Sequence, residues 1–380
     1  MSDPGFGIYV HWPYCASICP YCDFNVRRDR GGAHSDLRNA LALDMEAQAA
    51  RAAERSAGSL FLGGGTPSLM RGEDVALLIE AARTSFGLAQ NCEITLEANP
   101  EHHARFAELV GAGVTRLSLG VQALRTPALM MLGRTHSVRQ ALTAVEDAAK
   151  SGARVSIDLI YARDGQSTEE WADELREALA LPIEHLSLYQ LTIEAGTPFA
   201  RAVARGRMHA ADAERAADLF AATQEITGAN GFPAYEISNY ARNTQAQSAH
   251  NLVYWRGGAW AGIGPGAHGR LTIDGARTAT RAHADPAAYM RAVLEKGAEW
   301  AEAERLSDAQ RGDEYLLMGL RLAEGVDRER LERLRGRALR ADLLTFFAAE
   351  GLVVFDARRL ALTPKGRALA DRIASELALA

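Results

Sequence analysis

Three of the four cysteines of this 380-residue chain lie within eight residues, at Cys15, Cys19 and Cys22. A closed zinc site needs four ligands, usually two pairs from separate turns, and no matching second pair follows this triplet. A disulfide framework uses an even number of cysteines, typically in a short secreted chain. Three thiolates at a C-x3-C-x2-C spacing instead suit a [4Fe–4S] cluster, in which one iron keeps an open position for chemistry on a small molecule.

A zinc site and a set of three buried structural cysteines also stay open as interpretations of the triplet. The fourth cysteine, Cys92, directly precedes the apolar run Glu93 to Ala98 and has no partner nearby in the sequence. We therefore expect Cys92 to be a buried or half-buried thiol and not a cluster ligand.

The cysteine loop resembles that of the radical S-adenosylmethionine (SAM) superfamily, because the spacing is the same and the aromatic Tyr21 directly precedes the third cysteine. The preamble, residues 8–14 (IYVHWPY), is similar to the branch that contains the oxygen-independent coproporphyrinogen III oxidases. In that branch the true oxidase has a fourth cysteine two positions after the third, where this chain has Phe24. The resemblance therefore favours the haem chaperones of the branch over its oxidases.

Short apolar runs alternate with longer helical patterns along the first half of the chain. Helices are expected at Ser35 to Ser56, capped by Ser35 or Asp36, and at Glu73 to Phe86, Glu101 to Ala112, Ser137 to Ser151 and Thr168 to Leu181. Between them we expect six strands: Gly7 to Val10, Ser59 to Leu62, Glu93 to Ala98, Arg116 to Leu119, Val155 to Ile160 and His185 to Leu188. Consecutive right-handed βαβ units form a parallel sheet. Six strands predict an α/β fold with a partial (β/α)6 TIM-like barrel, which the resemblance also implies.

Polar or glycine-rich residues recur just after these strands, where chemistry gathers in parallel sheets. The Gly63 to Ser68 turn could bring a ligand close to bare backbone, although a triglycine is also an ordinary tight turn. Glu97 is, without the resemblance, a solvated loop acid. An arginine can pair with a carboxylate and an aspartate can accept from ribose hydroxyls. The resemblance implies a SAM site formed by Tyr9, Gly64, Gly65, Thr66, Glu97, Gln122, Arg134 and Asp158.

One segment departs from the family pattern. Relatives usually have Tyr-Gly-Leu-Pro-Gly-Gln where this chain has Tyr161-Ala-Arg-Asp-Gly-Gln166, so the proline is lost. Gly165 and Gln166 remain, which indicates an altered turn and not a lost site. The ligand contacts of Arg163 and Asp164 stay open.

The stretch His250-Asn-Leu-Val-Tyr-Trp255 places an imidazole beside two aromatic rings. The residues alone favour a strand edge in which His250 bonds Asn251 or a backbone carbonyl. The same string is, by resemblance, a signature associated with haem, so His250 is also a candidate axial ligand of haem iron. His268, in the glycine-rich segment 262–269, is a weaker second candidate. His209, His283 and the pair His102-His103 are expected at the surface.

The character of the sequence changes near residue 304. We expect a barrel core over residues 1–240, a haem-motif segment and connection over 241–303, and a winged-helix-like C-terminal domain over 304–380. Helices at Leu306 to Ala323 and Asp327 to Phe347 precede a two-strand hairpin, Gly351 to Phe355 with Arg359 to Leu362. Acids interleave with the arginines between residues 328 and 340, and the net charge is −6, so we expect a lid or docking module and no nucleic-acid binding.

The sequence lacks both an apolar run of about eighteen residues and a signal-peptide pattern, so we expect a cytoplasmic protein without a membrane span, compatible with peripheral membrane association. The resemblance implies a [4Fe–4S] cluster held by the three cysteines, exchangeable SAM, haem, an electron donor such as flavodoxin or ferredoxin, and a haem-acceptor protein, with a respiratory enzyme one candidate. By resemblance, electron donation from the cluster would cleave SAM to methionine and a 5′-deoxyadenosyl radical, which in relatives with oxidase activity abstracts hydrogen from the substrate.

Two alternatives to the haem chaperone are kept. One is an oxygen-independent coproporphyrinogen III oxidase, disfavoured by Phe24 and by the short segment ahead of Tyr9. The other is a haem-binding or scaffold protein whose cluster is only structural.

Overall fold

The computed structural model describes residues 4–31, 34–297 and 300–379. The six expected strands are all present and lie side by side in one sheet, each parallel to its neighbour. Their order across the sheet is the order of the sequence, as right-handed βαβ units require. The strands are β1 (Phe6–Trp12), β4 (Ala57–Gly64), β5 (Leu88–Ala98), β6 (Arg116–Gln122), β7 (Arg154–Tyr161) and β8 (His185–Gln190).

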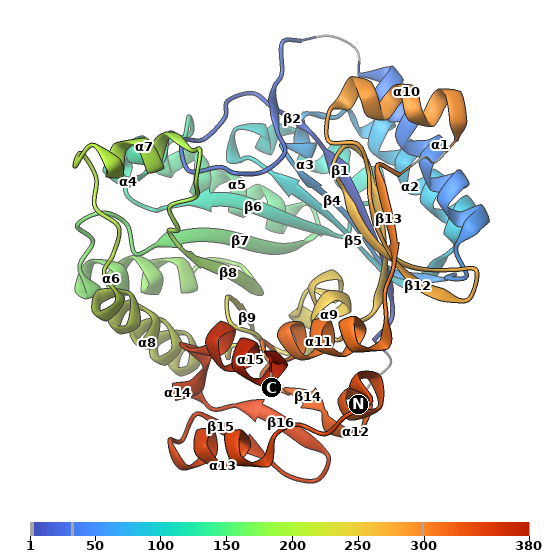
Figure 1. The fold of residues 1–380 in the computed structure, drawn as a ribbon. Coiled ribbons are helices and arrows are strands. Elements are labelled where there is room, and N and C mark those ends of the chain that lie inside the picture. Colours follow the sequence, from blue (N-terminus) through green and yellow to red (C-terminus); the bar gives the residue numbers. More distant parts are fainter. Residues whose placement is uncertain (1–3, 32–33, 298–299, 380) are drawn as a thin grey trace.

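Helices follow these strands, and the longer ones cover the outer face of the curved sheet (Figure 1). They are α1 (Ser35–Arg51), α2 (Gly72–Phe86), α3 (Phe106–Gly111), α4 (Thr126–Met131), α5 (Val138–Lys150), α6 (Thr168–Leu179), α7 (Pro198–Ala204) and α8 (Ala213–Ala229). Side chains of Ser137 and Ser167 cap α5 and α6 in capping boxes. The helix expected from Glu101 is split, because the 3-10 turn η2 (Pro100–Arg105) precedes α3.

The expected cap of the first helix is wrong. Its N-cap is His34, which makes no side-chain capping bond, and Ser35 is already helical. The helix also ends earlier than Ser56, a residue whose φ of 60° is incompatible with a continuing right-handed helix.

The sheet continues beyond β1 with strands from the second half of the chain. β10 (Ala259–Ile263) pairs with β1 in parallel, and β11 (His268–Ile273), β12 (Ala276–Arg281) and β13 (Glu302–Arg305) follow antiparallel. At the other edge, β9 (Asn239–Ala241) pairs antiparallel with β8. Helix α10 (Pro286–Lys296) packs beside α1. The segment from 241 to 303 therefore contributes four strands to the sheet that carries the cysteine loop.

The C-terminal part has a hydrophobic core of its own, formed by residues between Tyr315 and Leu377. It consists of α11 (Asp308–Gly319), α12 (Arg328–Arg335), α13 (Ala341–Ala349), α14 (Pro364–Arg367), α15 (Ala370–Leu379) and a small sheet. The expected hairpin, β15 (Val353–Phe355) with β16 (Arg359–Leu362), gains a third strand, β14 (Val326–Asp327). The single helix expected from Asp327 to Phe347 is wrong, because Gly336 ends α12 in a left-handed conformation.

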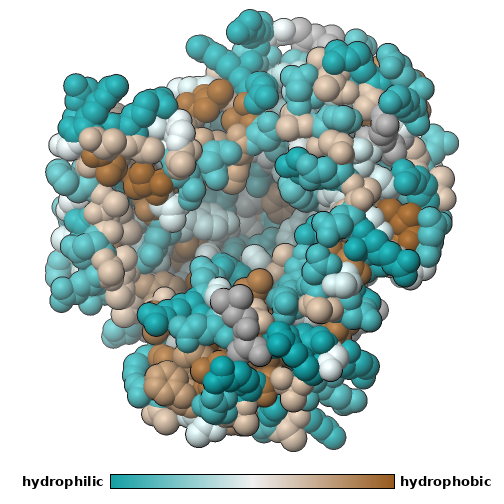
Figure 2. Space-filling model, viewed as in Figure 1, coloured by the Kyte–Doolittle hydropathy of each residue, from teal (hydrophilic) through white to brown (hydrophobic). Residues whose placement is uncertain are grey.

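The space-filling view shows a hollow in the middle of the molecule, between the barrel and the C-terminal part (Figure 2). None of the helices in the described chain is both long and apolar enough to cross a membrane.

Candidate active site at the strand ends

The cysteine loop leaves the end of β1 and is held by backbone bonds. The short strands β2 (Tyr14–Cys15) and β3 (Arg27–Arg28) pair at its base, and Cys22 N–H donates to the carbonyl of Cys19. All three thiols are free and half-buried. Burial raises the pKa of Cys15 and, together with the neighbouring cysteines, raises that of Cys22 to about 11. Within the described residues no three Cys, His, Asp or Glu side chains already meet in a metal-binding geometry.

Arg134 connects this loop to the ends of two strands. Its Nη1 donates to the sulfur of Cys19 at 3.3 Å, and its Nη2 donates to Asn99 Oδ1 at 2.5 Å and to the Gly120 carbonyl at 3.0 Å. Its Nε is buried and has no hydrogen-bond partner among the described residues. The guanidinium thus joins the cysteine loop to the ends of β5 and β6.

The triglycine turn after β4 packs tightly against the start of the cysteine loop. Gly65 N–H donates to the Trp12 carbonyl at 2.6 Å, and Thr66 N–H donates to the Tyr14 carbonyl at 2.8 Å. A Cβ on Gly65 would lie 2.5 Å from the Tyr14 oxygen. The N–H groups of Gly65 and Thr66 are therefore bonded within the protein.

Two carboxylates lie on β5 and β7, the strands on either side of β6. Glu97 accepts from Gly64 N–H at 3.0 Å, and Asp158 accepts from Ser118 Oγ at 3.4 Å. Burial, followed by the charge of Asp158, raises the pKa of Glu97 to about 8. Burial raises the pKa of Asp158 to about 6, against the opposing effect of its bonds to Ser187 and Ser118. Buried carboxylates with raised pKa values are often found at binding or catalytic sites.

Two further candidates are Gln122, at the end of β6, and Tyr9, in the middle of β1. Gln122 has a φ of 66° at an irregularity between β6 and β7, which is strained for a residue other than glycine. Its amide nitrogen lies 3.0 Å from the Cβ that Gly120 lacks. On β1, the Tyr9 hydroxyl donates to His11 Nδ1 at 2.9 Å, because His11 Nε2 is occupied in donating to the Asn25 carbonyl.

The altered turn after β7 is internally bonded. Arg163 forms a buried ion pair with Glu174, whose side chain is fully buried and also accepts from Leu124 N–H at 2.6 Å. Asp164 accepts from the backbone N–H of His209 at 3.1 Å. Both charged side chains left open by the sequence are therefore engaged with protein groups.

The strand edge expected around His250 is wrong, because the stretch forms the helix α9 (Ala249–Trp255). His250 is buried and bonds neither Asn251 nor a backbone carbonyl. Its Nδ1 lies 2.9 Å from Ser59 Oγ and its Nε2 lies 2.7 Å from the Tyr254 hydroxyl. Phe61 stacks on the imidazole at 5.1 Å. Both ring nitrogens are thus satisfied within the protein, and burial lowers the pKa of His250 to about 3.

The remaining candidates lie outside these bonded groups. Phe24 is 66% exposed on the cysteine loop, and His268 is exposed at the start of β11. Cys92 is half-buried inside β5, as expected, and burial raises its pKa to about 11. The surface position expected for His102 is wrong, since it is half-buried and bonds Ser68 Oγ at 2.8 Å.

Sequence reasoning missed the residues that position α9. Glu93 accepts from Ala249 N–H at 2.8 Å, at the start of the helix. Arg116 is almost fully buried, pairs with Glu93 at 2.8 Å, and also donates to the Ala246 carbonyl at 3.0 Å. The available signal was a charged residue, Glu93 or Arg116, at the start of an apolar run. Nothing in the sequence indicates that these two side chains pair with each other or that they hold α9.

Comparisons with known proteins identify the family of the chain. A model of the radical SAM superfamily matches residues 9–178, and a model of the HemN C-terminal domain matches residues 306–369. Heme chaperone HemW of Mycobacterium tuberculosis is 37% identical over 386 residues, covering 99% of this chain and 96% of the relative. Heme chaperone HemW of Escherichia coli is 37% identical, covering 86% of this chain and 85% of the relative.

Relatives also occur in animals. Mitochondrial radical S-adenosyl methionine domain-containing protein 1 of Bos taurus is 36% identical, covering 96% of this chain and 86% of the relative. Among solved structures, coproporphyrinogen III oxidase (HemN) from Escherichia coli superposes with a TM-score of 0.81 at 22% identity, covering 98% of this chain and 90% of that one. At this identity the likeness establishes the fold alone, and the partial barrel predicted from the sequence is confirmed.

Proposed function

The chain belongs to the radical SAM superfamily, in its HemN/HemW-like branch, and from this premise we propose that it is a haem chaperone that binds haem and transfers it to an acceptor protein. The observation that carries the proposal is the position two residues after Cys22. This position holds Phe24, which is 66% exposed and has no thiol, whereas the resemblance places a fourth cysteine there in the oxidase. Relatives named as haem chaperones, which are similar over nearly the whole chain, support it.

We propose that Cys15, Cys19 and Cys22 hold three irons of a [4Fe–4S] cluster. The donor set fits this group, because three half-buried thiols share one loop and a guanidinium contacts the sulfur of Cys19. Binding would draw the thiols together and release their protons, which the raised pKa values of Cys15 and Cys22 retain in the bare loop. When bound, such a cluster supplies an electron and an open iron for the amino-acid end of SAM.

We propose that the SAM site is the hollow at the strand ends. Carbonyls of the Gly64–Thr66 turn and the Glu97 carboxylate would accept from the ammonium group, and Arg134 would neutralise the carboxylate. Asp158 would accept from the ribose hydroxyls, and Tyr9 and Gln122 would complete the walls. The contact of Arg134 with both Cys19 and Asn99 supports this arrangement, because it joins the cluster loop to the sheet.

We propose that His250 becomes a haem ligand only after a rearrangement of its surroundings. In the structure its two nitrogens face Ser59 and Tyr254, and neither is open to an incoming iron. Exposure of Nε2 would require the buried Tyr254 side chain to move, while Ser59 could keep its bond to Nδ1.

Haem transfer is the decisive test. The reduced, cluster-loaded protein is incubated anaerobically with haem and a candidate apo-protein, and the absorption spectrum of the separated acceptor is recorded. Transfer is expected, and we propose a respiratory enzyme as acceptor and flavodoxin or ferredoxin as electron donor.

A parallel incubation with SAM, an electron donor and coproporphyrinogen III tests the alternative. Formation of decarboxylated porphyrinogen would overturn the chaperone in favour of the oxidase. Absence of both haem transfer and SAM cleavage would indicate a scaffold whose cluster is structural. For His250, we expect His250→Ala to change the absorption spectrum of bound haem, and an unchanged spectrum and affinity would remove it as a ligand.

A further inference from the structure

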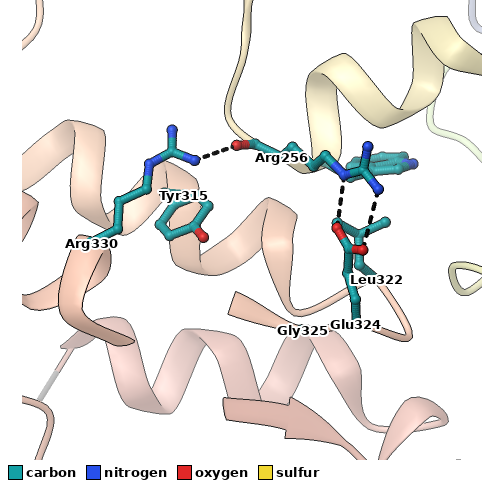
Figure 3. Close-up of a pocket in the computed structure, with 7 residues that line it drawn as sticks. Arg256, Tyr315, Leu322, Glu324, Gly325 and Arg330 are labelled. Atoms are coloured by element: carbon teal, nitrogen blue, oxygen red, sulfur yellow. Dashed lines mark hydrogen bonds and ion pairs between the residues drawn. The ribbon is translucent and has the colours of Figure 1, made fainter. Parts of the chain in front are cut away.

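A pocket of about 180 Å³ lies away from the cysteine loop, where strands β10 to β12 meet helices α11 and α12. Its walls come from both the sheet and the C-terminal part of the chain. A smaller cavity beside it, with room for no more than a water molecule, shares Tyr315 and Arg330 with it (Figure 3). In that view Arg256 donates two hydrogen bonds to the Glu324 carboxylate, so the charged groups that line this smaller cavity include an ion pair.

The larger pocket, which we call the junction pocket, carries excess positive charge. Arg277, Arg311 and Arg330 line it, and Glu314 is the acid that faces them. The Glu314 carboxylate is already paired with Arg270 at 2.5 Å, and Arg311 is paired with the exposed Asp308 at 2.8 Å. A cationic pocket on a chain of net charge −6 is a local feature and not a reflection of overall composition.

Arg277 is the cation of this pocket that comes from the sheet. It is half-buried and donates to the carbonyl of Gly258, but in the described part of the chain no carboxylate lies within ion-pair distance of it. Burial lowers its pKa to about 10, against the more distant charges of Glu54 and Glu314. A half-buried guanidinium of this kind is stabilised by an anion, and a carboxylate matches its planar donor geometry.

Flat apolar walls stand beside these cations. The Trp260 ring lines the pocket, with the Arg277 guanidinium 6.0 Å from its centre, and Met318 and Leu334 complete the apolar lining. Gly257 packs closely against the Tyr315 ring, since a Cβ there would lie 3.0 Å from the ring. Charged groups next to rings suit a ligand that has a carboxylate on a flat conjugated body.

The junction pocket is continuous with the helix that carries the haem motif. The Trp260 ring meets the Tyr254 ring edge-on at 4.7 Å, and Tyr254 in turn meets His250 at 4.7 Å. Gly257 lies just beyond the end of α9. A ligand edge in the pocket would therefore lie two aromatic rings from His250.

We infer that the junction pocket binds the carboxylate edge of a flat conjugated ligand, and, resting on the proposed function, that this ligand is haem, held by its propionates. Arg277 and Arg311 pair with the carboxylates while Trp260 contacts the ring edge. Pockets for whole drug-sized ligands measure roughly 300–1,000 Å³, so this one takes an edge and leaves the remainder of the macrocycle outside. A half-enclosed haem suits a protein that must release it.

Metal-free protoporphyrin IX and its dimethyl ester separate carboxylate recognition from iron ligation. Fluorescence titrations of both compounds use the full-length parent, Arg277→Met and Arg311→Met. We expect each substitution to weaken binding of the diacid about tenfold, the size of one charge-assisted hydrogen bond, and to leave the weaker binding of the ester unchanged. Arg291→Met, an exposed arginine on α10, is the matched control and should behave as the parent.

Circular dichroism identifies any variant that fails to fold, and Arg311, whose side chain is 40% exposed, tolerates substitution more readily than Arg277. Equal binding of the diacid by the parent and a folded Arg277→Met or Arg311→Met variant, or equal binding of the diacid and ester by the parent, overturns the inference and leaves the haem chaperone standing. A parent that binds the diacid through Arg277 but transfers no haem overturns the chaperone and keeps the pocket. A parent that binds no porphyrin overturns both.

Discussion

Arg134 donates a hydrogen bond to the sulfur of Cys19 at 3.3 Å, although the two residues are 115 positions apart in the sequence. Hydrogen bonds and positive charge near cluster sulfurs raise the reduction potential of an iron–sulfur centre. We therefore expect Arg134→Met to make the reduction potential of the reconstituted cluster more negative. A redox titration monitored by electron paramagnetic resonance measures the shift, and Arg139→Met, an exposed arginine on α5, is the control. An unchanged potential would show that the guanidinium does not act on the cluster.

Gly65 is expected to be intolerant of any side chain. A Cβ there would lie 2.5 Å from the carbonyl oxygen of Tyr14, so Gly65→Ala must displace the base of the cysteine loop. We expect a loss of about 1–3 kcal/mol in the free energy of unfolding, as for an overpacked site, and a lower iron content after reconstitution. Gly58→Ala is the matched control, because the nearest atom to its Cβ, the Phe6 oxygen, is 3.9 Å away. Equal iron contents would contradict the prediction.

Glu97 should make stability depend on pH. Its pKa is about 8 in the folded protein, chiefly through burial, against an ordinary value of 4.5. The folded state therefore holds this proton more tightly than the unfolded chain, so the stabilisation is fully present below about pH 4.5 and is lost as pH rises towards 8. We expect Glu97→Gln to flatten the fall of the melting temperature across this window. Thermal unfolding at several pH values measures it, and parallel curves for parent and variant would refute the assignment.

Tyr254→Phe tests whether His250 must be released before it binds iron. The variant loses the hydroxyl 2.7 Å from His250 Nε2 but keeps the ring that packs on Trp260. We expect it to be about 1 kcal/mol less stable, the typical contribution of one hydrogen bond, and to bind haem more tightly. Absorbance titration with haem measures the affinity. A weaker affinity would make the Tyr254 hydroxyl a haem contact in its own right.

The ion pair of Arg163 and Glu174 should be structural. Both side chains are buried, at 6% and 0% exposure, so Arg163→Met leaves an uncompensated carboxylate in the core. We expect a loss of about 3–5 kcal/mol in the free energy of unfolding, measured by urea denaturation. The folded variant should keep the SAM affinity of the parent, and a selective loss of SAM binding without destabilisation would return Arg163 to the ligand site.

The parallel core of the fold could be predicted from the sequence because each of its strands is a local apolar run followed by a helical pattern. All six strands are found, extended by a few residues at their ends. The pairing of β10 with β1 could not be predicted, because it joins residues about 250 positions apart and leaves no local signal. The β14 strand was missed for a simpler reason, since two residues show no period.

The candidate site, like the fold, could be predicted only where its signal is local in the sequence. Cysteine spacing marks the loop, whereas the bond between His250 and Ser59 spans 191 positions and shows only in three dimensions. The helix α9 was mistaken for a strand because its aromatic residues have high strand propensity, while the cap from Ser248 and the bond from Glu93 that start the helix depend on tertiary structure.

The pairing of β1 with β10 also has a consequence for the order in which the molecule can be completed during synthesis. The strand that leads into the cysteine loop leaves the ribosome long before one of its two flanking strands, β10, which is made only once the chain has reached residue 259. Until then β1 is an edge strand, with one row of backbone groups unpaired. The loop therefore gains its final support late, after most of the barrel has been translated, and a cluster inserted earlier would enter an unfinished site.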